Sequence, residues 1–246
     1  MDTHHRPFLA YCATGTLLAA ALVASNPASS DARATGSPTL DPGSFAHPVQ
    51  NPWFPLTPGL VTRLRGVDDG GQVKEVVKVT HRTKTILGVR ARVFRDVVRR
   101  TDGSLAEKTH DWYAADDAGN VWYLGEDTAT YDRHGHVESR EGSWEAGRHG
   151  AQPGILVPAD AGTASSATRP EFQKGSAEDQ SWFVQHLRRL HSHGHRFHSV
   201  VRSFEWTRLE PGVISEKFYA AGLGIIAEHD VAGGQETFWL VSAHRP

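Results

Sequence analysis

Cysteine is almost absent from the sequence: the 246 residues contain one, Cys12, and a single methionine. Cys12 lies in an N-terminal segment that we expect to be removed, so the remaining chain has no disulfide and no thiol chemistry. About 210 residues remain, which suffice for one domain stabilised by burial alone. A lipid anchor at Cys12 is disfavoured, because the bulky Tyr11 precedes it and the apolar run follows it.

A long hydrophobic run is also missing. The apolar stretch 17–24 is shorter than the roughly 20 residues that a bilayer-spanning helix needs. Arg6 precedes this stretch, and Ala32-Arg33-Ala34 supplies a small-x-small cleavage pattern after it. We therefore expect a cleavable signal peptide at residues 1–34, with cleavage nearer Ser25 or Ser30 as the alternative. The protein is then secreted or extracytoplasmic in the cell envelope, without a stable transmembrane segment.

Charge of one sign is not in excess, since the formal net charge is −2 and no basic block occurs. A nucleic-acid role therefore has no electrostatic support. No glycine-rich phosphate loop precedes a helix, so no nucleotide is expected, and no cofactor of another kind is indicated. The Gly-x-Ser-x-Gly elbow of serine hydrolases is also absent.

The sequence lacks a long apolar pattern with a period of 3.6 residues, which disfavours a parallel sheet with crossover helices. Short alternating runs occur instead, separated by turns rich in Asp, Asn and Gly. We predict strands at 61–67, 73–80, 85–87, 90–99, 105–114, 121–125, 136–141, 182–190, 199–209, 213–219, 225–231 and 236–241. A short helix at 180–190 is the alternative to a strand there, and 151–170 reads as one long loop.

These runs predict a mainly β fold with few or no helices. About ten strands joined by hairpins form an antiparallel meander that curls into a barrel or half-open barrel, with a sandwich as the alternative. Residues 35–50 are rich in Ser, Gly and Pro and predict a flexible tether. Residues 51–246 then form a single antiparallel β domain, which we expect to be a monomer.

Several phrases of the sequence occur together in a recognisable order. They are Asn-Pro-Trp-Phe-Pro-Leu-Thr-Pro-Gly at 51–59, Asp-Trp-Tyr-Ala at 111–114, Gly-Asn-Val-Trp-Tyr-Leu-Gly-Glu at 119–126, Gly-Ser-Trp-Glu-Ala-Gly at 142–147 and Tyr-Ala-Ala-Gly-Leu-Gly at 219–224. Together they resemble a family of uncharacterised secreted bacterial proteins of actinobacterial type, over roughly residues 50–242. The resemblance implies no activity. The last phrase is similar to one in periplasmic lipoprotein domains built as open β-barrels.

Carboxylates and aromatic residues are densest between residues 111 and 145. Two carboxyl groups beside flat rings are what a glycan-cleaving site requires. The weak catalytic candidates are Asp111, Glu126, Glu141 and Glu145, and the candidate ligand-binding residues are Trp112, Tyr113, Trp122, Tyr123 and Trp144. Aromatic residues on paired strands also build cores, which is the structural alternative for all five.

Five histidines lie between residues 186 and 198. In one continuous strand, His191, His193 and His195 would share a face and could hold Zn, Cu or Ni. Gly194 and Ser192 favour a hairpin tip instead, where the histidines are exposed and solvated. We expect the exposed tip rather than a metal site.

The sequence does not define a biochemical role. The favoured hypothesis is a non-enzymatic secreted domain that binds an apolar or amphipathic small molecule or a cell-surface component. The alternatives are an extracellular hydrolase, acting for example on a glycan through the carboxylates of 111–145, and a structural protein of the cell envelope. Enzymatic activity is uncertain and disfavoured.

Overall fold

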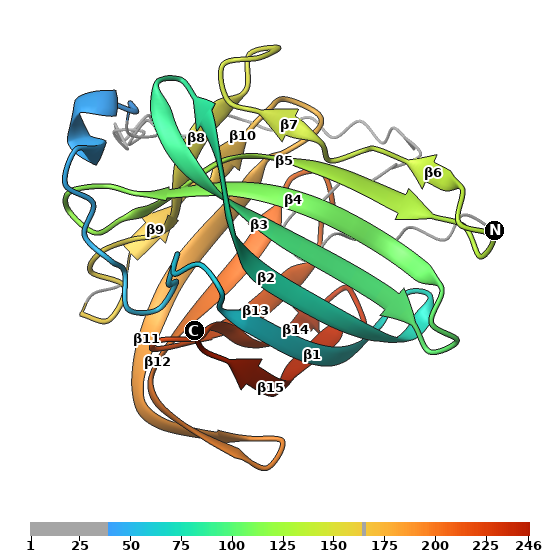
Figure 1. The fold of residues 1–246 in the computed structure, drawn as a ribbon. Coiled ribbons are helices and arrows are strands. Elements are labelled where there is room, and N and C mark those ends of the chain that lie inside the picture. Colours follow the sequence, from blue (N-terminus) through green and yellow to red (C-terminus); the bar gives the residue numbers. More distant parts are fainter. Residues whose placement is uncertain (1–38, 164–165) are drawn as a thin grey trace, which may run out of the picture.

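A computed structural model describes residues 39–163 and 166–246, so the expected signal peptide and Cys12 lie outside the described residues. The chain is almost entirely β (Figure 1). One 3-10 helix, η1 (Pro42–Phe45), precedes the strands. The strands are β1 (Val61–Asp68), β2 (Gly71–Ile86), β3 (Val89–Arg100), β4 (Leu105–Ala115), β5 (Val121–Tyr131), β6 (Val137–Ser139), β7 (Trp144–Glu145), β8 (Gln152–Val157), β9 (Ser166–Thr168), β10 (Glu171–Phe172), β11 (Asp179–Ser192), β12 (His195–Thr207), β13 (Ile214–Ala220), β14 (Gly224–Ala232) and β15 (Thr237–His244).

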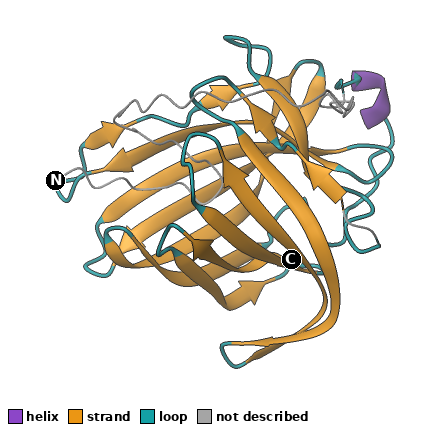
Figure 2. Cartoon of the chain, turned by 180° about the vertical axis from the view of Figure 1, so that it is seen from behind, coloured by secondary structure: helices purple, strands orange, loops and turns teal. Residues whose placement is uncertain are grey.

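All strands belong to one antiparallel sheet that curls strongly (Figures 1 and 2). Its order is β10-β8-β5-β4-β3-β2-β1-β15-β14-β13-β12-β11-β9, with β6 and β7 pairing with β5 outside this path. Hairpins join most neighbours, and β1 pairs with β15, so the first and last strands lie side by side. The expected mainly β fold with a half-open barrel is confirmed, because the sheet curls without closing.

The two edges of the sheet lie near each other without pairing, along a line that we call the seam. β9 pairs with β11 at one edge, and β10 pairs with β8 at the other. The expectation of a single loop at 151–170 is therefore wrong, since this stretch contains β8 and β9. The sequence did not predict β8 because it contains Pro153 and Gly154, and neither residue type favours a strand by itself. Pairing with β5 and β10 supplies the stabilisation instead.

Aromatic rings fill one end of the barrel interior. Phe54 stacks on Phe94 at 5.5 Å between ring centroids and meets Tyr113 edge-on at 5.0 Å. Tyr113 stacks on Tyr123 at 4.7 Å, and Tyr123 meets Trp144 at 5.2 Å. Tyr113 lies directly opposite Tyr123 in the β4–β5 pair, so these two rings form a cross-strand pair. These rings pack the end of the barrel that the proline-rich segment 51–60 covers.

The segment before the barrel is anchored rather than free where the structure describes it. His47 N–H donates to the Asp117 carboxylate at 2.7 Å, and Val49 N–H donates to the Asp116 carbonyl at 3.0 Å. Phe45 also meets Trp122 edge-on. From residue 39 onward, the expected flexible tether is therefore corrected to a segment that packs on the β4–β5 turn.

The hairpin of β11 and β12 is much longer than its neighbours and extends past the barrel as an arm, residues 185–199 (Figure 2). The prediction of a strand at 182–190 is confirmed, and the alternative short helix at 180–190 is not formed. β13 pairs with β12 only as far as Val200, so the rest of the arm pairs within itself. Its turn contains His193 and Gly194, both with positive φ, as a two-residue hairpin turn requires.

Replacement of Gly154 by alanine tests the seam. A Cβ at this position would lie 1.8 Å from the Arg169 carbonyl oxygen, so β8 and β10 could not stay paired. We expect Gly154→Ala to lower the free energy of unfolding by roughly 3 kcal/mol or more in urea denaturation. Hydrogen exchange should also accelerate at Glu171 and Phe172.

Gly135→Ala is the matched control. Gly135 has φ +85° and no atom within 4 Å of an added Cβ, so only backbone strain is introduced. That strain costs about 1–2 kcal/mol and leaves exchange at the seam unchanged. Equal losses for the two variants would contradict the close approach at the seam.

Candidate functional site

Strand alternation places a set of acidic side chains inside the barrel. On the β2–β5 wall, five carboxyl groups point to the buried face, each with at most 6% of its surface exposed: Glu75, Asp96, Glu107, Asp111 and Glu126. Asp111 lies directly opposite Glu126 across the β4–β5 pair. Such burial is costly for ionised carboxyl groups, and it is the most unusual feature of this core.

The facing wall carries a buried lysine. Lys217 is 1% exposed, and its Nζ lies 2.6 Å from Glu205 Oε2 and 3.5 Å from Glu228 Oε1. Tyr219 donates its hydroxyl to Glu205 Oε1 at 2.9 Å. Burial by itself lowers the pKa of Lys217, but the charges of Glu205 and Glu228 outweigh it and raise that pKa well above the ordinary value. This ammonium group with two carboxylates is therefore a compensated arrangement.

The seam contributes two more buried acids. Glu171 on β10 is 1% exposed, and Asp179 on β11 is 4% exposed. Burial, reinforced by the charge of Asp179, raises the pKa of Glu171 well above its ordinary value. The interior therefore receives carboxyl groups from both edges of the sheet as well as from its walls.

A cavity of about 40 Å³ opens between the aromatic end and these acids. Asp96 and Asp111 are its two carboxyl groups, and Phe54, Leu60, Val79 and other apolar side chains form most of its wall. One water-sized sphere occupies roughly 10–15 Å³, so the cavity has room for a small polar head. Pro55, Leu223 and Gly224 also line it, from the covering segment and the β13–β14 turn.

Burial raises the pKa of the carboxyl groups around this cavity. It raises the pKa of Asp96 to about 6, and burial with the charge of Asp96 raises that of Asp111 to about 7. The same two causes bring the pKa of Glu107 to about 8. Because an apolar interior disfavours the charged form, these groups retain protons at pH values where surface carboxylates are ionised.

Hydrogen bonds satisfy some of these acids and leave others unsatisfied. Tyr123 donates its hydroxyl to Asp111 Oδ1 at 2.9 Å, and Thr109 donates to Glu107 Oε1 at 2.9 Å. Both carboxyl oxygens of Glu126 are buried without a hydrogen-bond partner among the described residues. Burial and the charge of Asp111 raise the pKa of Glu126 well above its ordinary value. Because a buried carboxyl group without a hydrogen-bond partner is costly, a ligand that donates hydrogen bonds to Glu126 would stabilise this wall.

Two of the four catalytic candidates come together and two do not. Asp111 and Glu126 face each other inside the barrel. Glu145 lies outside and binds Lys84 at 2.8 Å and Arg148 at 3.0 Å, while Glu141 is exposed in a turn. The carboxylates of residues 111–145 therefore do not form one cleft, and the inward pair is shielded from bulk solvent.

The five candidate ligand-binding aromatic residues are all buried, with at most 7% of each exposed. Tyr113, Tyr123 and Trp144 form the inner stack. Trp112 instead lies under the Lys84 ammonium, 3.2 Å from its ring centroid, and Trp122 donates Nε1–H to Asp116 at 2.8 Å. They do not form one surface. Tyr113, next to the cavity acid Asp111, is best placed near a ligand, and its binding role stays a prediction.

The histidine stretch does not form a common strand face. The turn falls at residues 193–194, so His191 lies on β11 one residue before its end and His195 begins β12. His193 stacks on Trp239 at 4.6 Å, while His195 contacts Phe197. The geometry behind a three-histidine metal site is therefore wrong. In the described part of the chain, no group of three or more His, Cys, Asp or Glu side chains is arranged to hold a metal ion.

Sequence reasoning missed most of the interior acids. They are Glu75, Asp96, Glu107, Glu171, Asp179, Glu205 and Glu228, together with Lys217. The alternating pattern of the sequence did contain an indication of these acids, because each acid on β2, β3 and β4 occupies a position where an apolar residue is expected. Lys74-Glu75, for example, puts one charge on each face of β2. Such a run is typical of a solvated strand, which is why the acids were not expected inside.

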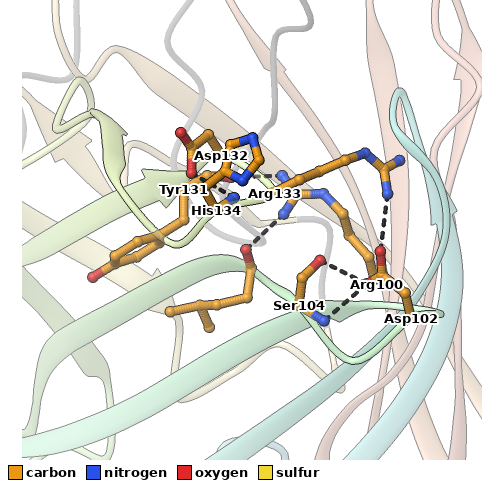
Figure 3. Close-up of polar contacts among 8 residues, drawn as sticks. Arg100, Asp102, Ser104, Tyr131, Asp132, Arg133 and His134 are labelled. Atoms are coloured by element: carbon orange, nitrogen blue, oxygen red, sulfur yellow. Dashed lines mark hydrogen bonds and ion pairs between the residues drawn. The ribbon is translucent and has the colours of Figure 1, made fainter.

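The polar turns that follow β3 and β5 contact each other at the end of these strands (Figure 3). Arg100 lies six residues beyond Phe94 on β3 and donates to the Leu105 and Tyr131 carbonyl oxygens, both at 2.6 Å. Arg133 and Asp102 pair at 3.0 Å across the two neighbouring turns. These contacts connect the turns at this end of the barrel.

Comparison with known proteins adds little. No protein-family model and no curated protein matches the sequence. The structure is similar to that of a predicted exported protein with a YmcC-like fold from Bacteroides fragilis. The TM-score is 0.42 and the sequence identity 14%, and the match covers 78% of this chain and 99% of that one. A predicted lipoprotein from Parabacteroides distasonis has a TM-score of 0.42 and 10% identity over 80% and 100%. Likeness at this level supports no conclusion on fold or function.

The raised pKa values predict how stability depends on pH. Glu107 titrates at about 8 in the folded protein against 4.5 ordinarily, so the folded state holds a proton that the unfolded chain has lost in between. Stability therefore falls as pH rises through that range, by about 1.4 kcal/mol per pH unit for each such group. Urea denaturation between pH 5.5 and 7.5 should show this decline, and Glu107→Gln should reduce its slope.

The control for this measurement is Glu141→Gln, since Glu141 is exposed in a turn and its replacement should leave the slope unchanged. Lys217 stays charged throughout this range, because its pKa is raised above an already high value. Stability that rises with pH between 5.5 and 7.5 would show that the interior acids are ionised in the folded protein.

Proposed function

We propose that this protein is a non-enzymatic, extracytoplasmic binding protein whose barrel holds the ammonium head of a small aliphatic amine against Asp96 and Asp111. The observation that carries the proposal is the cavity of about 40 Å³ with two buried carboxyl groups and mostly apolar walls. Location outside the cytoplasm rests on the predicted signal peptide. Among the described residues, no helix has the length and apolar character of a membrane span.

The interior already contains an example of the binding mode. The Lys217 ammonium sits between Glu205 and Glu228, inside the same barrel and equally shielded from water. On the opposite wall, Glu126 has two unpartnered oxygens, and no lysine or arginine forms an ion pair with Asp96, Asp111 or Glu126 among the described residues. A ligand ammonium group donates the hydrogen bonds that this wall lacks and compensates its charge.

The walls of the cavity favour an alkyl stem behind that head. Phe54, Leu60, Val77, Val79 and Phe94 offer apolar surface but no hydrogen-bond donor. A metal ion is less suited, because it needs several oxygen ligands converging on one point and no such group of three is formed by the described residues. A primary amine needs only one or two carboxylates and gains from contact of its methylene groups with the wall.

Glycan hydrolysis is a weaker candidate. It requires two carboxyl groups on either side of a sugar-sized cleft. Asp111 and Glu126 are 3% and 1% exposed, and the cavity is far smaller than a sugar ring with its neighbours would need. The raised pKa of Asp111 suits a general acid, yet it equally suits a carboxyl group that exchanges its proton for an ammonium ligand.

Calorimetric titration with n-butylamine tests the proposal. The amine should bind more tightly at pH 8 than at pH 6 and should release protons on binding, because ammonium and proton compete for the raised carboxyl groups. Asp111→Asn removes one partner of the ammonium group. A charge-assisted hydrogen bond contributes about 1.5–3 kcal/mol, so the affinity should fall roughly ten- to hundredfold.

Two controls make the test specific. Asp127→Asn changes an exposed carboxylate one residue from Glu126 on the outer face of β5 and should leave the affinity unchanged. 1-Butanol has the same stem without the charge and should bind much more weakly. Equal binding of the alcohol, or a loss of affinity in Asp127→Asn as large as that in Asp111→Asn, would refute the carboxylate site.

A further inference from the structure

The outer surface of the same strands carries the opposite charge. Six exposed cations project from β1, β2 and β3, and we refer to them as the basic face: Arg63, Arg65, Lys74, Lys78, Arg95 and Arg99. Strand pairing brings them together, since Arg65 lies opposite Lys74, Lys74 opposite Arg99, and Lys78 opposite Arg95. Neighbouring strands lie about 4.8 Å apart and alternate residues about 6–7 Å apart, so the cations form a dense grid.

This grid contains no exposed acid, since Glu75, which also lines the depression, is buried on the inner face of β2. The other outward positions between the cations are Val76 and Val97, and no cation of the basic face forms an ion pair with a described residue. Arg99 donates to the Gly103 carbonyl oxygen at 3.0 Å, which orients its guanidinium without neutralising it. Like charges at this spacing repel one another, and an anionic partner removes that cost.

The basic face is hollowed rather than flat. A depression of about 550 Å³ is lined by Arg63, Arg65, Lys74, Arg95 and Arg99 around Val76 and Val97. The valines form a low floor, and the longer cationic side chains stand on both sides of it. This shape suits a narrow chain that lies along the floor with its charges directed at both rows.

The arm borders this depression on the β15 side. Its turn residue His193 stacks on Trp239, and Trp239 lies directly opposite Arg65 across the β1–β15 pair. Arg188, Arg189 and Arg196 are exposed on the arm. The arm therefore extends the positive surface beyond the sheet, which gives a partner longer than the depression further cations to contact.

We propose that the basic face binds a linear, flexible phosphodiester polymer of the cell envelope, with its phosphates along the two rows of cations. The proposal is independent of the amine site, which lies on the other face of the same strands. Repeating monoanions on a thin chain match repeating cations beside a narrow floor. A flexible chain can also follow the convex outside of a barrel, which a stiff duplex touches over a short length only.

A bilayer surface fits this face less well. Peripheral membrane binding combines basic residues with apolar side chains that enter the acyl region. The large apolar side chains exposed in the described structure are Val49, Leu87, Val137, Trp182, Ile214, Val231 and Val241, and only Val241 lines the depression. The floor residue Val97 is itself buried. Charge without protruding apolar groups indicates a polymer in solution rather than a membrane.

Binding of soluble poly(glycerol phosphate) tests this proposal. The logarithm of the association constant should fall linearly with the logarithm of salt concentration, by about 0.7 for each phosphate contact of a single chain. The double variant Lys74→Gln/Arg99→Gln should bind more weakly and reduce that slope by about 1.4. Both side chains are exposed, so the melting temperature and butylamine binding should stay unchanged.

The matched control is Arg90→Gln/Lys174→Gln, which removes two exposed cations outside the basic face and changes net charge equally. It should retain the salt slope of the unmodified protein. Three results would overturn the proposal: an equal loss in the control, binding to phosphatidylglycerol vesicles without binding to the soluble polymer, or tighter binding to duplex DNA than to the polymer at the same salt concentration.

Discussion

The structure depends on the geometric constraint that a curled sheet sends every second side chain into one enclosed space. On β2, β3 and β4, that constraint buries acids at positions that in most barrels are apolar. Their desolvation has three consequences. It raises the pKa values of these carboxyl groups, makes the stability of the fold depend on pH, and creates a demand for a donor that Glu126 does not find among the described residues.

Lys217 shows how the fold meets this demand on one wall. It pairs with Glu205 and Glu228 and remains charged although it is almost fully buried. The wall of Asp96 and Asp111 has no such lysine, but it has a cavity and apolar surface beside it. On both walls, buried carboxyl groups require a positive charge nearby. Lys217 supplies it on one wall, and we propose that the ammonium group of a ligand supplies it on the other. Burial favours the protonated form of the carboxyl groups on the second wall when no ligand is bound.

The formal net charge of −2 conceals a separation of charge across a single layer of backbone. Carboxyl groups gather inside, while arginine and lysine gather on the outside of the same strands. Because burial raises the pKa of Glu107 to about 8, this group is largely neutral at pH 7, and the interior carries less negative charge than its composition suggests. A net charge near zero therefore does not predict which partners a barrel binds, since its inner and outer faces meet different environments.

Alternation and turn chemistry in the sequence by themselves determined the antiparallel meander and most strand positions. Tertiary structure decided what local patterns do not encode. The strand at 152–157 exists because β5 and β10 pair with it, and the histidines were separated by a turn. Above all, the curling of the sheet decided which charged face became the interior. When a strand has charged residues on both faces, its sequence does not indicate which face will be buried. The direction in which the sheet curls decides this, and it buries Glu75 and exposes Lys74.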